Sequence, residues 1–155
     1  GLACVGNLGS LQRFSYSAIG DTVNLAARVE GLTKQYAVTV LVTGEVCARV
    51  EDLAMLELDR VQVVGRSEAV GLHALLGDAQ MAASADFTAY REQHQQMIAL
   101  YQQGQFAQAR QALEPLMAQP WPGLGSFYTV LSQRLLELQQ LPAGQWQGVH
   151  VASSK

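Results

Sequence analysis

Asn24 and Arg28 are the two residues whose types and spacing best suit chemistry. They stand four positions apart in a predicted helix that starts just after Gly20. Positions i and i+4 share one face of a helix, so the amide and the guanidinium project together. An amide and a fixed cation aimed at one spot suit a phosphorylated ligand whose charge grows during reaction. By itself, the spacing is more often that of an ordinary polar residue near a surface cation.

The helix that carries this pair is predicted over residues 21–35. Asn24 and Arg28 fall on a polar face next to its apolar stripe. The stripe consists of Leu25, Val29, Leu32 and Tyr36. Residues 1–6 and 11–17 are predicted strands, and the Asn- and Gly-containing stretch between them favours a hairpin, because both residue types tolerate positive φ.

The rest of residues 1–78 continues to mix strands and helices. Residues 37–43 (AVTVLVT) are a predicted buried strand, and residues 44–51 a predicted short helix. Residues 53–64 and 69–76 are two further predicted strands around a turn. This order predicts a layered α/β sandwich, an α+β fold, over the first part of the chain.

Residues 79–155 form a second part that is rich in Gln, Ala and Leu and has helical periodicity. We expect three helices there, an all-α helical tail that begins just after Gly77 and Asp78. Residues 101–109 (YQQGQFAQA) look like the middle of a tetratricopeptide-type helix pair. One such unit cannot bury both of its faces alone, so we expect the tail to pack on the α/β part or on a partner.

Composition excludes several classes of protein. Of the 155 residues, 49% are hydrophobic and 15% are charged, which is typical of a folded globular protein. The net charge of -3 argues against a general nucleic-acid binder. No apolar run is long enough to span a membrane and no signal peptide is visible. We expect a cytoplasmic location without membrane contact for this stretch, and a membrane anchor elsewhere in a longer parent protein stays open. Cys4 and Cys47 are expected to be buried thiols without a disulfide, and the His residues have no metal-ligand spacing.

Four stretches of residues 1–76 resemble the C-terminal half of a class III nucleotide cyclase catalytic domain, the adenylate/guanylate cyclase family. They are residues 5–10 (VGNLGS), 16–28 (YSAIGDTVNLAAR), 32–36 (LTKQY) and 58–66 (LDRVQVVGR), and their order and spacing agree with the family. The resemblance implies a ferredoxin-like cyclase half-domain over residues 1–78. Residues 79–155 resemble, more weakly, the helical extension that follows this domain in some bacterial members.

The resemblance also implies a reaction. Family members convert ATP or GTP to a 3′,5′-cyclic nucleotide and pyrophosphate with two Mg²⁺ or Mn²⁺ ions, at the interface of a dimer of catalytic domains. Matching motif to motif, Asn24 would orient the ribose and Arg28 would stabilise charge on the α-phosphate. Ser17 falls at the base-reading position. ATP is the preferred substrate, and GTP stays open because a hydroxyl discriminates less than a carboxylate does.

This sequence departs from the family pattern in two places. Val64 stands where many members carry a triphosphate-binding Lys, and Arg66 is the candidate to replace it. The family's two metal-binding aspartates belong to its N-terminal half, which precedes the stretch that this chain matches. The chain begins at Gly1 and opens directly into a strand-like run, so we expect a piece of a longer protein that is inactive alone and supplies no metal ligand. The alternative is a degenerate, cyclase-like module that dimerises or acts as a scaffold without catalysis.

Overall fold

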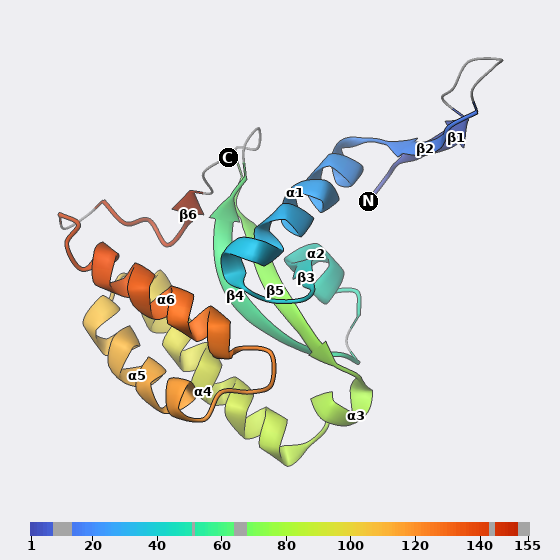
Figure 1. The fold of residues 1–155 in the computed structure, drawn as a ribbon. Helices are drawn as coiled ribbons and strands as arrows, with labels where there is room; N and C mark the ends of the chain where they lie inside the picture. The colour runs from blue at the N-terminus through green and yellow to red at the C-terminus, as the bar shows by residue number, and fades with distance from the viewer. Residues whose placement is uncertain (8–13, 51, 64–67, 143–144, 152–155) are drawn as a thin grey trace.

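A computed structural model describes residues 1–7, 14–50, 52–63, 68–142 and 145–151, and it shows a mixed α/β protein (Figure 1). The described strands form a two-stranded sheet of β1 (Cys4–Asn7) and β2 (Tyr16–Ile19) and a four-stranded sheet. The order in the second sheet is β3 (Leu41–Thr43), β5 (Val70–Gly77), β4 (Ala54–Gln62) and β6 (His150–Val151). Within the described ranges, none of the helices is both long and apolar enough to cross a membrane.

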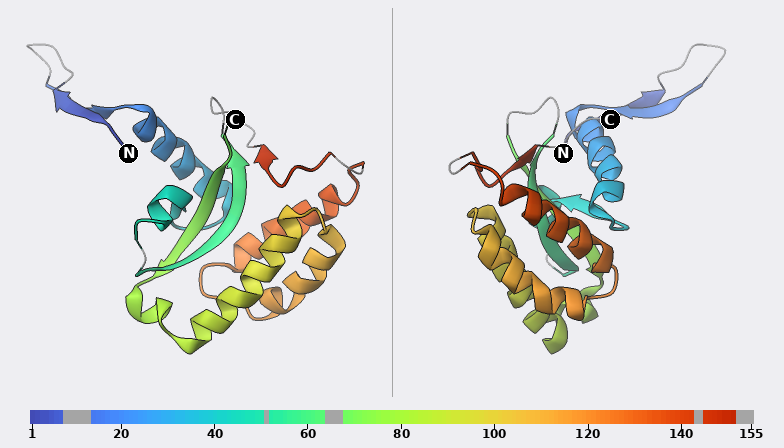
Figure 2. Two further views of the ribbon diagram at one scale, coloured as in Figure 1. Left: turned by 180° about the vertical axis from the view of Figure 1, so that it is seen from behind. Right: turned by 60° about the vertical axis from the view of Figure 1, so that its left-hand side comes forward.

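The chain opens with a β-hairpin that leads directly into a long helix. Strand β1 (Cys4–Asn7) pairs antiparallel with β2 (Tyr16–Ile19), which confirms the predicted hairpin. Residues 8–13, including the start of the second predicted strand, lie outside the described residues. Both views in Figure 2 show the hairpin projecting away from the rest of the molecule. Helix α1 (Asp21–Tyr36) follows and confirms the predicted helix, which ends one residue later than expected.

The second sheet is built mainly from two long antiparallel strands, β4 (Ala54–Gln62) and β5 (Val70–Gly77). Strand β3 (Leu41–Thr43) pairs with β5 and is shorter than the predicted 37–43, because Ala37 closes α1 in the left-handed conformation and the chain needs a connection before it extends. Helix α2 (Gly44–Cys47) is also shorter than predicted. It buries no residue, so no packing extends it beyond one turn.

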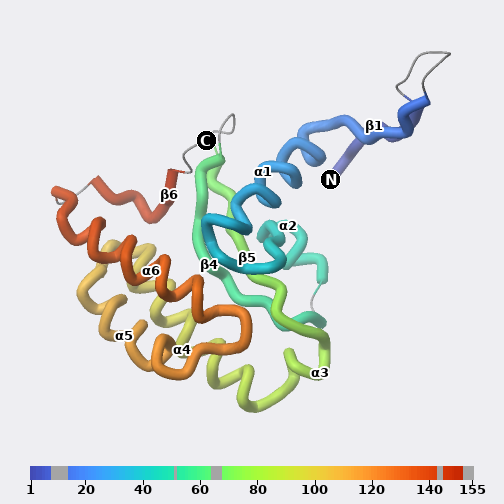
Figure 3. Tube along the Cα trace, in the orientation of Figure 1, coloured from blue at the N-terminus to red at the C-terminus, as the bar shows by residue number. Residues whose placement is uncertain are grey.

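The tail contains the three predicted helices, α4 (Ala85–Gln102), α5 (Phe106–Ala118) and α6 (Gly125–Leu138). A short helix, α3 (Ala79–Ala82), precedes them. The tail is not purely helical, which corrects the all-α prediction: strand β6 (His150–Val151) pairs in parallel with β4 (Figure 3). A two-residue strand has no periodicity of its own, and it forms only because β4 offers a free edge.

One hydrophobic cluster runs through both parts of the chain and confirms the predicted packing of the tail on the α/β part. The whole predicted stripe of α1 is buried in it. Helix α4 lies along β4, and α6 contacts the end of α1. The largest fully buried side chains come from α1, both long strands, the tail helices and the residue just before α6: Tyr36, Leu56, Leu58, Leu72, Phe87, Met97, Tyr101, Leu113, Leu116, Leu124, Phe127 and Tyr128.

Candidate functional site

Asn24 and Arg28 lie on an exposed face in the first half of α1. Leu25 and Val29, the residues that follow each of them, are buried in the core, so the helix turns its polar pair away from the protein. Among the described residues, neither polar side chain has a hydrogen-bond or ion-pair partner. The amide and the guanidinium therefore lie on an exposed part of α1.

Ser17 lies on the hairpin that precedes this helix. It is half-buried on β2 and pairs in register with Gly6 of β1. Its Oγ is 3.2 Å from the Oγ of Ser15, whose backbone N–H donates to Oδ1 of Asn7 at 3.0 Å. The structure thus places Ser17 on β2 and the Asn24–Arg28 pair on α1, the next element of the chain.

Gly20 forms the junction between the hairpin and α1. Its φ is +150°, a value that residues with a side chain rarely adopt. A Cβ at this position would lie 3.1 Å from the carbonyl oxygen of Leu2 and 3.3 Å from Cα of Ala3. Only a glycine fits both this φ and the narrow space beside Leu2 and Ala3. Gly20 therefore fixes the direction in which the chain passes from β2 into α1.

Two other residues of the predicted site, Val64 and Arg66, lie outside the described residues, so the predicted triphosphate contact of Arg66 stays a prediction. Over the ranges that the structure describes, no three His, Cys, Asp or Glu side chains gather closely enough to hold a metal ion. The described residues therefore offer no fit for the Mg²⁺ or Mn²⁺ that the sequence resemblance implies.

A buried charged cluster, which we did not predict from the sequence, lies where α1, β4 and two tail helices meet. Asp59 is 0% exposed, and its Oδ2 accepts from the Tyr36 hydroxyl at 2.5 Å and from Nη1 of Arg134 at 2.6 Å. The Tyr101 hydroxyl lies 3.4 Å from the same oxygen. We call these four residues the Asp59 cluster. One signal was visible in the sequence: Arg134 interrupts the apolar stripe of the third tail helix.

The electrostatics of the Asp59 cluster keep both phenols protonated and the guanidinium charged. Burial, and then the nearby Asp59 carboxylate, raise the pKa of Tyr36 and of Tyr101. Burial acts to lower the pKa of Arg134, but its phenol neighbours and Asp59 outweigh this effect and raise it. The cluster is thus a fixed arrangement of donors around one buried carboxylate.

A second buried network surrounds His94 of α4. Its Nε2 donates to the Glu57 carbonyl at 2.6 Å, and its Nδ1 accepts from the Tyr128 hydroxyl at 2.9 Å. The Tyr90 hydroxyl donates to Tyr128 and accepts from the backbone N–H of Trp121, each at 2.9 Å. Burial lowers the pKa of His94 to about 4, and the bond to Glu57 opposes this only in part. Neutral His94 therefore joins the tail to β4 and has no exposed surface for catalysis.

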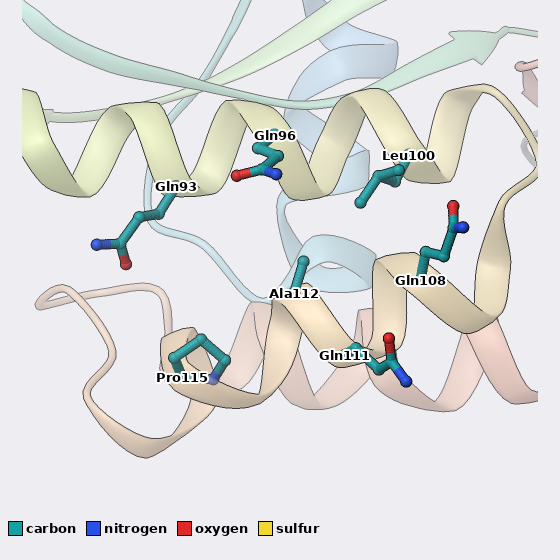
Figure 4. A pocket seen from close by; sticks show the side chains of 7 residues that line it. All are labelled: Gln93, Gln96, Leu100, Gln108, Gln111, Ala112 and Pro115. Atoms are coloured by element: carbon teal, nitrogen blue, oxygen red, sulfur yellow. The ribbon is translucent and has the colours of Figure 1, made fainter.

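A groove of about 670 Å³ lies between α4 and α5, and four glutamines line it together with Leu100, Ala112 and Pro115 (Figure 4). In Figure 4, Gln93 and Gln96 come from α4, and Gln108 and Gln111 from α5. None of the lining residues belongs to β2 or α1. The groove is therefore separate from the Asn24–Arg28 face.

Comparison with known proteins relates the chain to adenylate cyclases. It is 40% identical over 78 residues to "Adenylate cyclase 1" of Rhizobium meliloti (strain 1021), and 36% identical over 77 residues to "Adenylate cyclase" of Anabaena cylindrica. It is 32% identical over 80 residues to "Adenylate cyclase, terminal-differentiation specific" of Dictyostelium discoideum. The matches cover 50%, 47% and 49% of this chain, but only 12%, 15% and 4% of these relatives.

No family model matches the chain. No solved structure matches it either. The relationship is thus seen in the sequence identity to the three named proteins. About half of this chain is related in sequence to proteins named adenylate cyclase.

Proposed function

We propose that this chain is part of a class III nucleotide cyclase that converts ATP to 3′,5′-cyclic AMP and pyrophosphate in bacterial signal transduction. The observation that carries the proposal is the exposed Asn24–Arg28 face of α1, which has no partner among the described residues and stands directly after the Gly20 junction. The 40% identity to a protein named adenylate cyclase supports it.

Each polar residue takes one role in the proposed reaction. The 3′-oxygen of the ribose attacks the α-phosphorus, the bond to the pyrophosphate oxygen breaks, and the 3′-hydroxyl proton passes to solvent or a base. The Asn24 amide holds the ribose so that this oxygen faces phosphorus. The Arg28 guanidinium, which stays charged, donates to the oxygens that gain charge in the transition state. Ser17 contacts the base edge, which favours ATP and leaves GTP as an alternative substrate.

The proposal requires groups beyond the described residues. Mg²⁺ or Mn²⁺ would be held by carboxylates outside this chain, and the catalytic domain would work as a homodimer whose halves complete the site. The described residues contain no metal-binding cluster, so we expect no turnover from this 155-residue chain alone. Cyclic AMP made by the pure 155-residue protein would show that such metal ligands are not needed.

The test uses the full-length protein that contains this sequence, assayed with Mn²⁺-ATP for cyclic AMP. Arg28→Ala should lower kcat by about 100- to 1000-fold, the usual effect of removing one preorganised donor. Arg49→Ala is the matched control, because Arg49 is an exposed cation next to α2 and outside the proposed site. An active protein that Arg28→Ala leaves unchanged would refute the role of Arg28. A full-length protein without cyclase activity would favour the non-catalytic scaffold instead.

A further inference from the structure

The C-terminal end of α1 is held by residues of the helical tail. Tyr36, the last residue of α1, is 0% exposed, and its hydroxyl donates to Asp59 of β4. Arg134 of α6 donates to the same carboxylate oxygen, and its guanidinium carbon lies 5.1 Å from the centre of the Tyr36 ring. Phe127, also of α6, stacks on that ring with centroids 6.4 Å apart. One tail helix thus contacts both the ring and the hydrogen-bond partner of Tyr36.

Arg134 is the charged group that makes this arrangement stable. A fully buried carboxylate needs an opposite charge and hydrogen bonds to remain ionised in the interior. Among the described residues, Oδ1 of Asp59 accepts only from the backbone N–H of Arg60, at 2.8 Å, so the opposite charge reaches the carboxylate at Oδ2. Without Arg134, the Asp59 carboxylate would keep only neutral hydrogen-bond donors. Either water would have to enter and hydrate it, or the carboxylate would have to shift its position.

Such a movement would be transmitted along α1. At 1.5 Å rise per residue, Tyr36 stands roughly 12 Å from Arg28 and roughly 18 Å from Asn24 along the helix axis. At its other end α1 joins the exposed β1–β2 hairpin, which projects from the body and offers little support (Figures 1 and 2). The contact at Tyr36 is therefore a polar anchor at the C-terminal end of α1, which acts together with the buried apolar stripe of the helix.

We infer that Arg134 is a positioning residue for the proposed active site: through Asp59 and Tyr36 it fixes the helix that presents Asn24 and Arg28. The catalytic part of this inference rests on the proposed function, whereas the anchoring of α1 does not. Arg134 acts only through its neighbours and is assigned no contact with the nucleotide. The helical tail thereby contributes to catalysis without lining the site.

The test compares Arg134→Met with Arg60→Met in the full-length protein. Arg60 is exposed and adjacent to Asp59, so its variant loses the same charge nearby without removing a side-chain donor to the carboxylate. With Mn²⁺-ATP, Arg134→Met should lower kcat by about 10- to 100-fold and change KM by less than about 3-fold, as expected for reacting groups that are misplaced by about 1 Å. In the same variant, backbone amides in residues 28–36 should exchange hydrogen at least ~10-fold faster. Arg60→Met should change neither quantity.

Two further variants separate positioning from folding. Arg134→Lys keeps the charge but loses the planar fork, so it should recover part of kcat and of the exchange protection. The double variant Asp59→Leu with Arg134→Met removes both charges, so it leaves no unpaired buried charge and should fold more stably than Arg134→Met alone. Its kcat should nevertheless stay low, because the Tyr36 hydroxyl then has no partner. A double variant with full kcat and full protection of α1 would overturn the inference.

The remaining outcomes are also decisive. A folded Arg134→Met protein with unchanged kcat and unchanged exchange in α1 refutes the inference. Lower kcat without faster exchange refutes the anchoring step. If the unaltered full-length protein makes no cyclic nucleotide, the proposed function fails and the catalytic role of Arg134 fails with it. The exchange rates in α1 still decide in that case whether the tail anchors this helix.

Discussion

His94 should make the stability of the protein fall between pH 7 and pH 5. The imidazole is 0% exposed, and both of its nitrogens are in use, because Nε2 donates to the Glu57 carbonyl and Nδ1 accepts from the Tyr128 hydroxyl. Protonation would turn Nδ1 from an acceptor into a donor that faces another donor, and it would bury an unpaired charge. Burial accordingly lowers the pKa of His94 from 6.5 to about 4.

The size and the sign of the effect follow from this pKa. In the unfolded chain His94 has its ordinary pKa of 6.5. Between pH 6.5 and pH 4, the unfolded state therefore binds a proton at His94 that the folded state does not bind. The resulting stability is fully present above pH 6.5 and is lost as the pH falls towards the folded pKa. The shift corresponds to roughly 3 kcal/mol in total, of which roughly 2 kcal/mol should be lost between pH 7 and pH 5.

Urea denaturation at pH 7, 6 and 5 measures this loss. His73 and His150 shift in the same direction through burial, so the original protein must be compared with His94→Gln, whose neutral amide can still donate to Glu57. The difference between the two pH profiles isolates His94. His73→Gln is the matched control and should keep most of the slope. Equal slopes for the original protein and His94→Gln, or a stability that rises as the pH falls, would refute the reasoning.

Two further variants test the tail. Tyr128→Phe should cost about 1–3 kcal/mol in urea denaturation, because it leaves Nδ1 of His94 without its donor in the interior; an unchanged midpoint would contradict the network. Gly148→Ala should destabilise the protein by about 1–2 kcal/mol, because its φ is +74° and the new Cβ would lie 2.9 Å from the Gln102 carbonyl oxygen. The matched variant Gly31→Ala, in open space on α1, should instead stabilise the protein by about 0.5–1 kcal/mol. Thermal denaturation of both glycine variants measures the contrast, and equal shifts would contradict it.

The elements that sequence reasoning predicted are those whose signals are local. Helix α1 agrees with its prediction to within one residue, because its apolar stripe recurs at helical spacing and a glycine precedes it. The tail helices are equally regular, and Ser84 caps α4 by accepting from the N–H of Phe87. The turn residues between β1 and β2 indicated the hairpin that the structure shows. Each of these signals spans fewer than about 20 residues, a distance over which propensity and periodicity are informative.

The features that sequence reasoning missed depend on residues that are far apart in the chain. Tyr36, Tyr101 and Arg134 are 23, 42 and 75 residues from Asp59, and no local pattern connects them. Strand β6 has two residues and exists only through its pairing with β4. The placement of Asn24 and Arg28 on an exposed face was predictable from their spacing, whereas their catalytic roles and the role of Ser17 remain predictions from the family resemblance.

The Asp59 cluster connects the α/β part of the chain to the helical tail. The composition changes near residue 78, yet the buried carboxylate of β4 takes one donor from α1 and its countercharge from α6. Undocking the tail would leave that carboxylate with the Tyr36 hydroxyl and one backbone N–H, and it would uncover the apolar residues of β4. Because an unpaired buried charge is so costly, such an opened form must admit water at the end of α1. Docking of the tail and ordering of α1 are therefore coupled, and any event that loosens the tail reaches the helix that carries Asn24 and Arg28.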